Sequence, residues 1–285
     1  MNFSSCKNEA HNWITLSPGE YYPDILPLAC ELYSPVLVTF GQLLEGSYSS
    51  EDLLLKISEL KPQWMRIQVC RVFRKYVSPE TPVEMLKKKS AAKSICENFG
   101  KGFRHIVEVQ KRFKSRPIPD EAICAILWEY KDRGKKGYDL TEQLFTLVKE
   151  KFPSLKVSGP ERAGRDIILG EIFDKYPKPD RPVDFILEQN NKILAIGLAR
   201  YDGDRGGAQE DDRTGQYRDC AIEFLNYKKE QNINTKIIFL NDGPGLLLGS
   251  MWDDYSYIDK QFGDEVKVVT LRMFSDFITM NWLNS

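Results

Sequence analysis

Residues 182–205 read PVDFILEQNNKILAIGLARYDGDR, and they say more about the fold than any other part of the chain. Residues 183–187 form a short apolar run that is typical of a buried strand. The polar residues 189–192 predict a turn, and residues 193–201 predict a second, largely buried strand. An acidic, glycine-rich loop follows at 202–207. The pattern indicates a β-hairpin within an α/β core.

Further elements are expected on both sides of this hairpin. A short helix is predicted near residues 165–176 and a longer one over about 210–230. Two more apolar runs, at 236–240 and 266–271, predict further strands. Helices that alternate with apolar strands favour an α/β class with a mixed sheet flanked by helices.

The chain before this core has a different sequence pattern. Prolines interrupt the first fifty residues, which are expected to be irregular at first. Apolar residues then recur at helical spacing over 53–60, and further helices are expected at 120–131 and 140–151. We therefore expect two parts, a mainly helical region over residues 1–155 and an α/β core over residues 156–285.

Acidic residues gather near the ends of the two strands of the hairpin. Asp184 begins an apolar strand, where a buried carboxylate is costly unless it binds a partner. Because side chains alternate along a strand, Arg200 and Asp202 share one face at the end of the second strand. Asp204 follows in the loop, and Glu171 lies on the preceding short helix. Cleavage of a phosphodiester bond needs this combination, a divalent metal held by carboxylates and a cation near the phosphate.

The order of these features resembles the core of the PD-(D/E)XK nucleases. It runs from an acid on a helix to a strand with an aspartate, a turn, a strand with a charged end, a helix and a strand. Residues 197–213, which read GLARYDGDRGGAQEDDR, also resemble a signature of type II restriction endonucleases. The chain length is similar to that of one subunit of the heterodimeric enzymes that cut asymmetric sites. The resemblance is sharp over 182–213 and only architectural elsewhere.

This resemblance implies a magnesium-dependent endonuclease that cuts double-stranded DNA at a specific sequence. The implied site residues are Glu171, Asp184, Arg200, Asp202 and Asp204. Asp184 and Asp202 would bind Mg²⁺, with Asp204 as an alternative second ligand. Residues 1–155 would serve in DNA recognition and dimerisation, and residues 156–285 would form the catalytic core. Duplex cleavage requires two active sites, so a homodimer or a heterodimer with a related subunit is expected.

One position departs from the motif of that class. An acid, any residue and a lysine usually end the second strand, but residues 197–200 read GLAR. Either Gly197 replaces the acid and the site is degenerate, or the motif has moved, with Arg200 as the cation and Asp202 or Asp204 as the second ligand. Arginine cannot act as a general base near neutral pH, so Arg200 would act electrostatically. The crowding of acids at the strand end favours the moved motif.

Basic residues are concentrated in the middle of the chain. The formal net charge is −1, yet residues 56–152 hold 22 Lys and Arg against 12 Asp and Glu. A basic segment suits a polyanionic partner, although solvated helix faces also carry such charges. The residues expected to contact DNA are Lys87, Lys88, Lys89, Lys93, Lys101, Arg104, Lys111, Arg112, Arg205 and Arg213.

Composition argues against several other classes of protein. The chain has two histidines and six scattered cysteines, which disfavours a zinc site and a Ser-His-Asp hydrolase. No apolar stretch is long enough to span a membrane, and the polar, acidic start is unlike a signal peptide. We therefore expect a cytoplasmic protein without a membrane partner.

Two alternatives to a site-specific nuclease stay open. A degenerate site would make the chain a DNA-binding subunit that leaves cutting to its partner. A repair or recombination nuclease of the same class would cut branched or damaged DNA without a fixed recognition sequence. The loop at 202–207 could also be an ordinary turn, since Asp and Gly favour turns.

Overall fold

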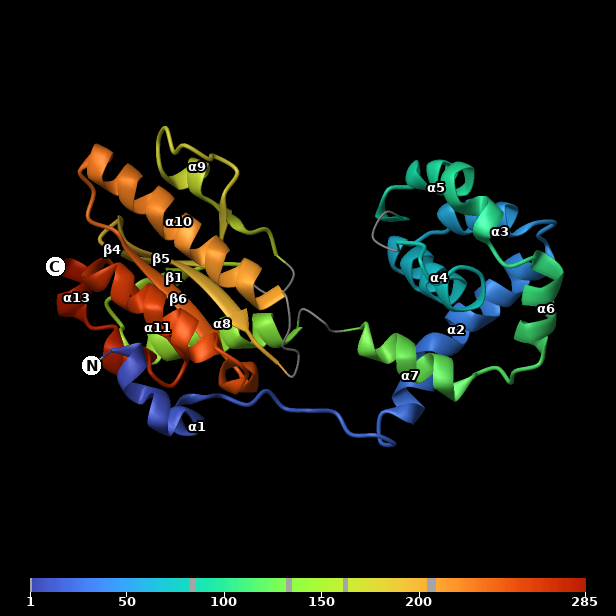
Figure 1. Cartoon of the computed structure of the whole chain (residues 1–285), viewed down its shortest axis with the longest axis horizontal. Coiled ribbons are helices and arrows are strands. Elements are labelled where there is room, and N and C mark those ends of the chain that lie inside the picture. The colour runs from blue at the N-terminus through green and yellow to red at the C-terminus, as the bar shows by residue number, and fades with distance from the viewer. Residues whose placement is uncertain (1, 83–85, 132–134, 161–163, 204–208) are drawn as a thin grey trace. The chain divides into compact units, whose positions relative to one another are not determined.

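A computed structural model describes the chain over residues 2–82, 86–131, 135–160, 164–203 and 209–285. The side chains of residues 135–136 and 209–213 are outside this description. The chain divides into two compact units (Figure 1). Met1–Pro18 and Gly134–Ser285 form the first, which we call the α/β unit, and Gly19–Arg133 form the second, the helical unit.

A five-stranded mixed sheet forms the centre of the α/β unit. Its strands, in spatial order, are β1 (Lys156–Ser158), β4 (Phe185–Gln189), β5 (Lys192–Tyr201), β6 (Lys236–Asp242) and β7 (Val266–Val269). The first three strands pair antiparallel, whereas β5, β6 and β7 run parallel to one another. A separate antiparallel pair joins β2 (Ile167–Ile168) to β3 (Pro182–Val183). The predicted α/β fold with a mixed sheet is thus confirmed.

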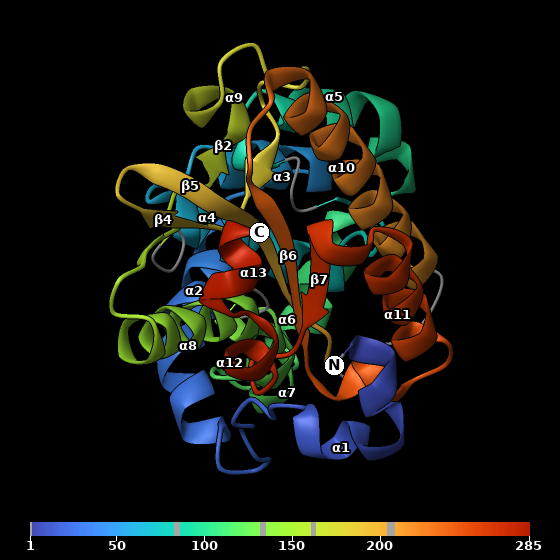
Figure 2. The same ribbon diagram turned by 90° about the vertical axis from the view of Figure 1, so that its left-hand side faces the viewer.

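Helices cover both faces of this sheet. In Figure 2, α10 and α11 lie on one side of the strands, and α8, α12 and α13 lie on the other. These helices span Lys135–Lys151 (α8), Gln209–Gln231 (α10), Met251–Gln261 (α11), Phe274–Phe277 (α12) and Met280–Asn284 (α13). Burial on both faces explains why residues 237–240 of β6 are apolar without alternation, since every residue of the strand is buried.

Aromatic contacts join distant parts of the chain in this core. On one face, the Tyr217 ring of α10 stacks on Phe239 of β6 with centroids 4.3 Å apart. Phe3, in the 3₁₀ helix η1 (Phe3–Glu9), stacks on Trp252 of α11, also at 4.3 Å. The short helix α1 (Ala10–Trp13) follows η1. The contact between Phe3 and Trp252 attaches the first residues of the chain to the α/β unit.

The helical unit has a hydrophobic core of its own. Its helices are α2 (Leu26–Glu45), α3 (Ser50–Ser58), α4 (Gln63–Tyr76), α5 (Ala91–Phe99), α6 (Ile106–Lys114) and α7 (Glu121–Glu129), with a 3₁₀ turn, η3 (Gly100–Gly102), after α5. Phe40 of α2 and Phe73 of α4 are fully buried in that core. Ser49 and Asp120 cap α3 and α7 by accepting backbone N–H groups, as N-cap residues do.

Three expectations differ from the structure. The boundary lies at Gly134 rather than near residue 155, because the apolar face of α8, including Leu144 and Val148, packs in the α/β core. The long helix α2 occupies a segment expected to be irregular. In place of a helix over 165–176, the strand β2 is followed by the one-turn helix α9 (Leu169–Ile172).

The revised boundary also changes the charge balance. Gly19–Arg133 contains 18 Lys and Arg against 15 Asp and Glu, and the rest of the chain contains 22 against 26. The helical unit is therefore only slightly basic, because its residues 19–55 add six Asp and Glu and no Lys or Arg. Within the described residues, no helix has both the length and the apolar character needed to span a membrane.

Candidate functional site

Polar residues from three strands meet at one edge of the sheet. Strands β5 and β6 are parallel and in register, with Arg200 opposite Asn241 and Tyr201 opposite Asp242. Strand β4 runs antiparallel to β5, so its beginning lies at the same edge as the end of β5. We call this edge, which carries Asp184, Arg200, Asp202, Asn241 and Asp242, the polar edge.

Asp184 lies at the bend between β3 and β4 and is half-buried. Its Oδ2 accepts a hydrogen bond from the backbone N–H of Ala199 at 2.7 Å. Burial raises the pKa of Asp184 and the negative charge of Asp166 raises it further, while the Ala199 hydrogen bond lowers it. Within the described residues, Oδ1 has no hydrogen-bond partner and no cation lies within ion-pair distance of the carboxylate. Such a carboxylate would be stabilised by a bound cation.

Arg200 and Asp202 form an ion pair at the end of β5. The guanidinium Nε donates to Asp202 Oδ1 at 3.1 Å, and the hydroxyl of Tyr255 donates to Asp202 Oδ2 at 3.4 Å. Asp202 is only 4% exposed. The expectation that Arg200 and Asp202 lie together is therefore met, but both oxygens of Asp202 already accept hydrogen bonds.

The loop after β6 holds the backbone of Asp202 in place. The N–H of Asp202 donates to the carbonyl of Asp242 at 2.7 Å, and the N–H of Gly245 donates to the carbonyl of Asp202 at 3.0 Å. Gly243 has a φ of +107°, and a Cβ there would lie 2.1 Å from the Asp202 oxygen. A glycine is therefore required at this close approach.

Tyr217 and Asn241 form a second buried polar pair beside Arg200. The Tyr217 hydroxyl donates to Asn241 Oδ1 at 3.0 Å, while Asn241 Nδ2 has no partner within the described residues. Burial raises the pKa of Tyr217 well above its usual value. The charge of Arg200 lowers this pKa, and the charges of Asp184 and Asp202 raise it.

Asp242 organises the opposite side of the polar edge. Its Oδ1 accepts from the N–H groups of Thr15 and Gly243, both at 2.7 Å, and its Oδ2 accepts from Leu271 at 2.9 Å. Nearby, the Tyr201 hydroxyl accepts from the N–H of Ser17 at 2.7 Å. These bonds fasten residues 15–17 to the end of the sheet, so the role of Asp242 is structural.

Sequence reasoning missed the residues that surround Arg200. Asn241 and Asp242 directly follow the apolar residues 237–240, and polar residues at the carboxyl end of a strand in an open α/β sheet are a usual sign of a site. That signal was available for these two residues. Tyr217 and Tyr255 follow no such pattern, because both are buried aromatic residues on helices that are distant in sequence.

Of the remaining expected site residues, Glu171 lies outside this cluster, and Asp204 is not among the described residues. Glu171, on α9, is exposed and forms an ion pair with Arg165. Asp204 and Arg205 lie outside the described residues, and so does the side chain of Arg213. Among the residues that the structure describes, no three His, Cys, Asp or Glu side chains are grouped so as to bind a metal ion.

The packing around Gly197 leaves no room for a side chain. It pairs with Phe185, whose ring covers it, and a Cβ at Gly197 would lie 2.0 Å from that ring. Alternation along β5 also places Gly197 on the face opposite to Arg200. The residue two positions before Arg200, on the same face, is Leu198. The hypothesis that Gly197 replaces a catalytic acid is therefore at odds with this packing.

The described residues fit a magnesium site only in part. Asp184 is half-buried and has one carboxylate oxygen without a partner among the described residues, which suits a hard cation. Asp202 is engaged by Arg200 and Tyr255, and Glu171 is engaged by Arg165. The set of ligands expected from the sequence is therefore not assembled among these side chains.

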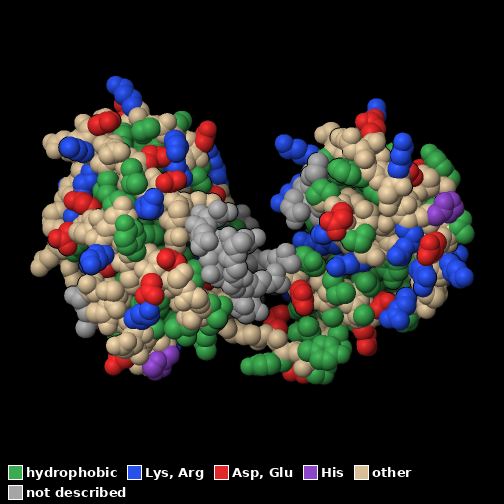
Figure 3. All heavy atoms as spheres, viewed as in Figure 1, with side chains coloured by type: hydrophobic (Ala, Val, Ile, Leu, Met, Phe, Trp, Pro, Cys, Tyr) green, Lys and Arg blue, Asp and Glu red, His purple; other side chains and the backbone are tan. Residues whose placement is uncertain are grey.

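Most of the basic residues expected to contact DNA are exposed on the helical unit. Of these, Lys89, Lys93 and Arg112 pair with Glu59, Glu97 and Glu108 respectively. Within the described part of the chain, the others have no carboxylate partner; they are Lys87, Lys88, Lys101, Arg104 and Lys111. On the face drawn in Figure 3, basic and acidic side chains of this unit are interleaved.

A buried arginine supports part of this basic surface. Arg66 of α4 is 6% exposed, and its guanidinium donates to the carbonyl oxygens of Leu60, Leu86 and Lys87 at 3.1 to 3.3 Å. These bonds fix the backbone where the lysine run begins. A lysine would make fewer such bonds, since it lacks the planar fork of arginine.

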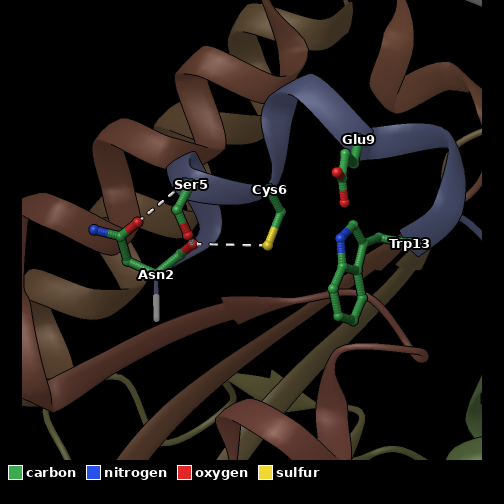
Figure 4. Close-up of a pocket in the computed structure, with 5 residues that line it drawn as sticks. All are labelled: Asn2, Ser5, Cys6, Glu9 and Trp13. Carbon is green, nitrogen blue, oxygen red and sulfur yellow. Dashed lines mark hydrogen bonds between the residues drawn. The ribbon is translucent and has the colours of Figure 1, made fainter.

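A pocket of about 480 Å³ lies on the N-terminal segment of the α/β unit (Figure 4). Asn2, Ser5, Cys6, Glu9 and Trp13 line it. Asn2 and Ser5 bond to one another, and Cys6 contacts the carbonyl of Asn2. None of the residues expected to be functional contributes to this pocket.

Comparisons with protein-family models, with curated proteins and with solved structures each found no match for this chain.

Proposed function

We propose that the chain is a magnesium-dependent endonuclease, or a subunit of one, that cleaves double-stranded DNA. The observation that carries the proposal is Asp184, a half-buried carboxylate with a raised pKa, at the same sheet edge as Arg200. A strand with an aspartate, a turn, a strand with a charged end, a helix and a parallel strand follow one another in the order that the sequence resemblance implies.

In this proposal, Asp184 is the carboxylate that binds Mg²⁺. The bound ion would polarise the scissile phosphate and activate a water molecule. Arg200 supplies a cation for the phosphate, and the exposed lysines of the helical unit contact the DNA backbone. Asp204 stays the candidate second ligand. Two copies, or one copy and a related subunit, would cut the two strands.

A second candidate function is favoured by a specific observation. Asp202 is engaged by Arg200 and Tyr255, and the position of the usual acid is taken by Leu198, so a complete ligand set is missing among the described side chains. The chain would then be a DNA-binding subunit that leaves cutting to its partner. This function predicts DNA binding without cleavage by the chain alone.

Plasmid digestion tests the proposal directly. The purified chain is incubated with supercoiled plasmid in Mg²⁺ or in EDTA, and Asp184→Asn is compared with Asp180→Asn, an exposed carboxylate in the same segment. We expect discrete nicked or linear products that need Mg²⁺, that persist in Asp180→Asn and that disappear in Asp184→Asn. Cleavage retained in Asp184→Asn would contradict the proposal.

The products also separate the alternatives. Defined fragments indicate a site-specific enzyme, whereas a smear indicates a repair or recombination nuclease. Binding of duplex DNA without any cutting supports the non-cleaving subunit, and the assay is then repeated with the product of any adjacent gene.

A further inference from the structure

Among the residues that the structure describes, Arg200 is held through one of its three guanidinium nitrogens. Nε donates to Asp202 Oδ1 at 3.1 Å, and within the described residues the two terminal nitrogens have no hydrogen-bond partner. The side chain of Arg200 is 29% exposed, whereas that of Asp202 is 3% exposed. The buried carboxylate therefore holds the guanidinium through Nε and leaves the two terminal nitrogens without a partner among the described residues.

We propose that Asp202 and Tyr255 are positioning residues that orient Arg200 toward a DNA phosphate, and that Asp202 is not a metal ligand. This assignment rests on the proposed nuclease function. Two terminal guanidinium nitrogens match two phosphate oxygens, so a guanidinium held at Nε remains able to bind a phosphate through both. Tyr255 holds Asp202 in turn, since its hydroxyl donates to the second carboxylate oxygen at 3.4 Å.

The packing around Asp202 favours a fixed residue that positions Arg200 over a metal ligand that moves. Its backbone is bonded on both sides, to the carbonyl of Asp242 and the N–H of Gly245. A Cβ at Gly245 would lie 2.5 Å from the carbonyl oxygen of Gly203, so the loop packs directly on this segment. A ligand at this position would have to give up Arg200 and leave an arginine without its partner, which is costly in a partly buried place.

The first experiment reads the orientation of Arg200 without any nuclease activity. The full-length chain is labelled with phenylglyoxal, and modification of Arg200 is followed by peptide mass spectrometry, with the exposed Arg272 as internal reference. Asparagine keeps one oxygen acceptor but removes the negative charge of Asp202, so the guanidinium is held more weakly. We therefore expect labelling of Arg200 to rise at least about threefold in Asp202→Asn and by a smaller factor in Tyr255→Phe. Tyr257→Phe, on the same helix but 60% exposed, should behave as the wild type.

The second experiment uses cleavage under single-turnover conditions in a double-mutant cycle. If Asp202 acts through Arg200, Asp202→Asn slows cleavage about tenfold in the wild type and less than about twofold in Arg200→Ala. A metal ligand would instead give losses that multiply in the double variant. Tyr255→Phe removes only a hydroxyl, so it repeats the test should Asp202→Asn fold poorly.

The two experiments test the positioning role and the nuclease function separately. Unchanged labelling of Arg200 in both Asp202→Asn and Tyr255→Phe overturns the positioning role, whether or not the chain cuts DNA. Multiplying losses in the cycle overturn it as well. A wild-type chain that neither cuts nor nicks DNA argues against the proposed function, and the labelling result then stands on its own.

Discussion

The Asp184 carboxylate accepts a hydrogen bond from the backbone N–H of Ala199 at 2.7 Å, which ties the beginning of β4 to the end of β5. One carboxylate oxygen is thus fixed by the sheet while the other has no partner within the described residues. The same edge carries Arg200, which lies one residue beyond Ala199 on β5. A negative and a positive group are in this way both positioned by backbone pairing, which is more rigid than positioning by loops.

The raised pKa of Asp184 should make the stability of the folded protein depend on pH. Burial raises its pKa in the folded protein, and an unfolded aspartate has a pKa of about 3.9. The unfolded chain then releases this proton first, so folded stability falls as the pH rises from about 3.9 through the raised pKa. Asp184→Asn removes this loss and keeps an acceptor for Ala199. We expect the variant to be more stable than the wild type at pH 7.5 in EDTA.

Urea unfolding at several pH values measures this difference. The gain in free energy of unfolding should shrink as the pH falls toward about 3.9. A wild type that is the more stable protein at pH 7.5, with an advantage that grows with pH, would contradict the assigned environment of Asp184. Asp180→Asn serves as the control and should change stability by no more than about 0.5 kcal/mol.

The buried pair of Tyr217 and Asn241 makes a prediction about stability. Tyr217→Phe leaves Asn241 Oδ1 buried without its donor, in addition to the Nδ2 that already lacks a partner among the described residues. We expect a loss of about 1–3 kcal/mol in the free energy of unfolding. Combining Tyr217→Phe with Asn241→Leu removes both polar groups and should restore part of this loss. Equal stability of Tyr217→Phe and the exposed control Tyr257→Phe would show that the pair is not formed.

Gly197 should tolerate no side chain while Phe185 is present. A Cβ at this position would lie 2.0 Å from the Phe185 ring, so Gly197→Ala forces the strand or the ring to move. We expect a loss of about 1–3 kcal/mol in stability, and a smaller loss for the same change in a Phe185→Leu background. Gly197→Asp should be at least as destabilising and should not increase cleavage. A stable, more active Gly197→Asp variant would support the idea of a degenerate site and overturn this packing argument.

The central elements of the fold could be predicted from local sequence. Strands β4, β5 and β6 are long apolar runs separated by clear turn or helix signals, and α10 lies close to the helix expected over 210–230. Helix α2 could not be predicted in this way, because its prolines indicated irregular structure. Pro27 lies in the first turn, where the missing N–H costs nothing, and the helix continues through Pro35.

The candidate site could be predicted only where it depends on neighbours in sequence. The face shared by Arg200 and Asp202 follows from alternation along one strand. Their engagement with Tyr255, by contrast, comes from a helix about fifty residues further on. The boundary between the units was equally out of reach, since the apolar face of α8 does not reveal which core it joins.

The salt dependence of DNA binding should separate exposed lysines that are free from those that are paired. Lys88 and Lys101 have no carboxylate partner in the described part of the chain, whereas Lys89 pairs with Glu59 at 2.6 Å. If the helical unit contacts phosphates, Lys88→Ala and Lys101→Ala should each lower the slope of log affinity against log salt by about 0.9. Lys89→Ala is the matched control and should change it less. Fluorescence anisotropy with a labelled duplex in Ca²⁺ measures the slopes, and unchanged slopes in both variants would remove these lysines from the interface.

A calorimetric titration of the full-length chain with Mn²⁺ tests most directly whether Asp184 binds the metal ion. We expect the wild type and Asp202→Asn to bind the ion with affinities that agree within about twofold, and Asp184→Asn to bind it at least about tenfold more weakly. Equal binding by the wild type and Asp184→Asn would contradict the central claim that Asp184 is the metal-binding carboxylate.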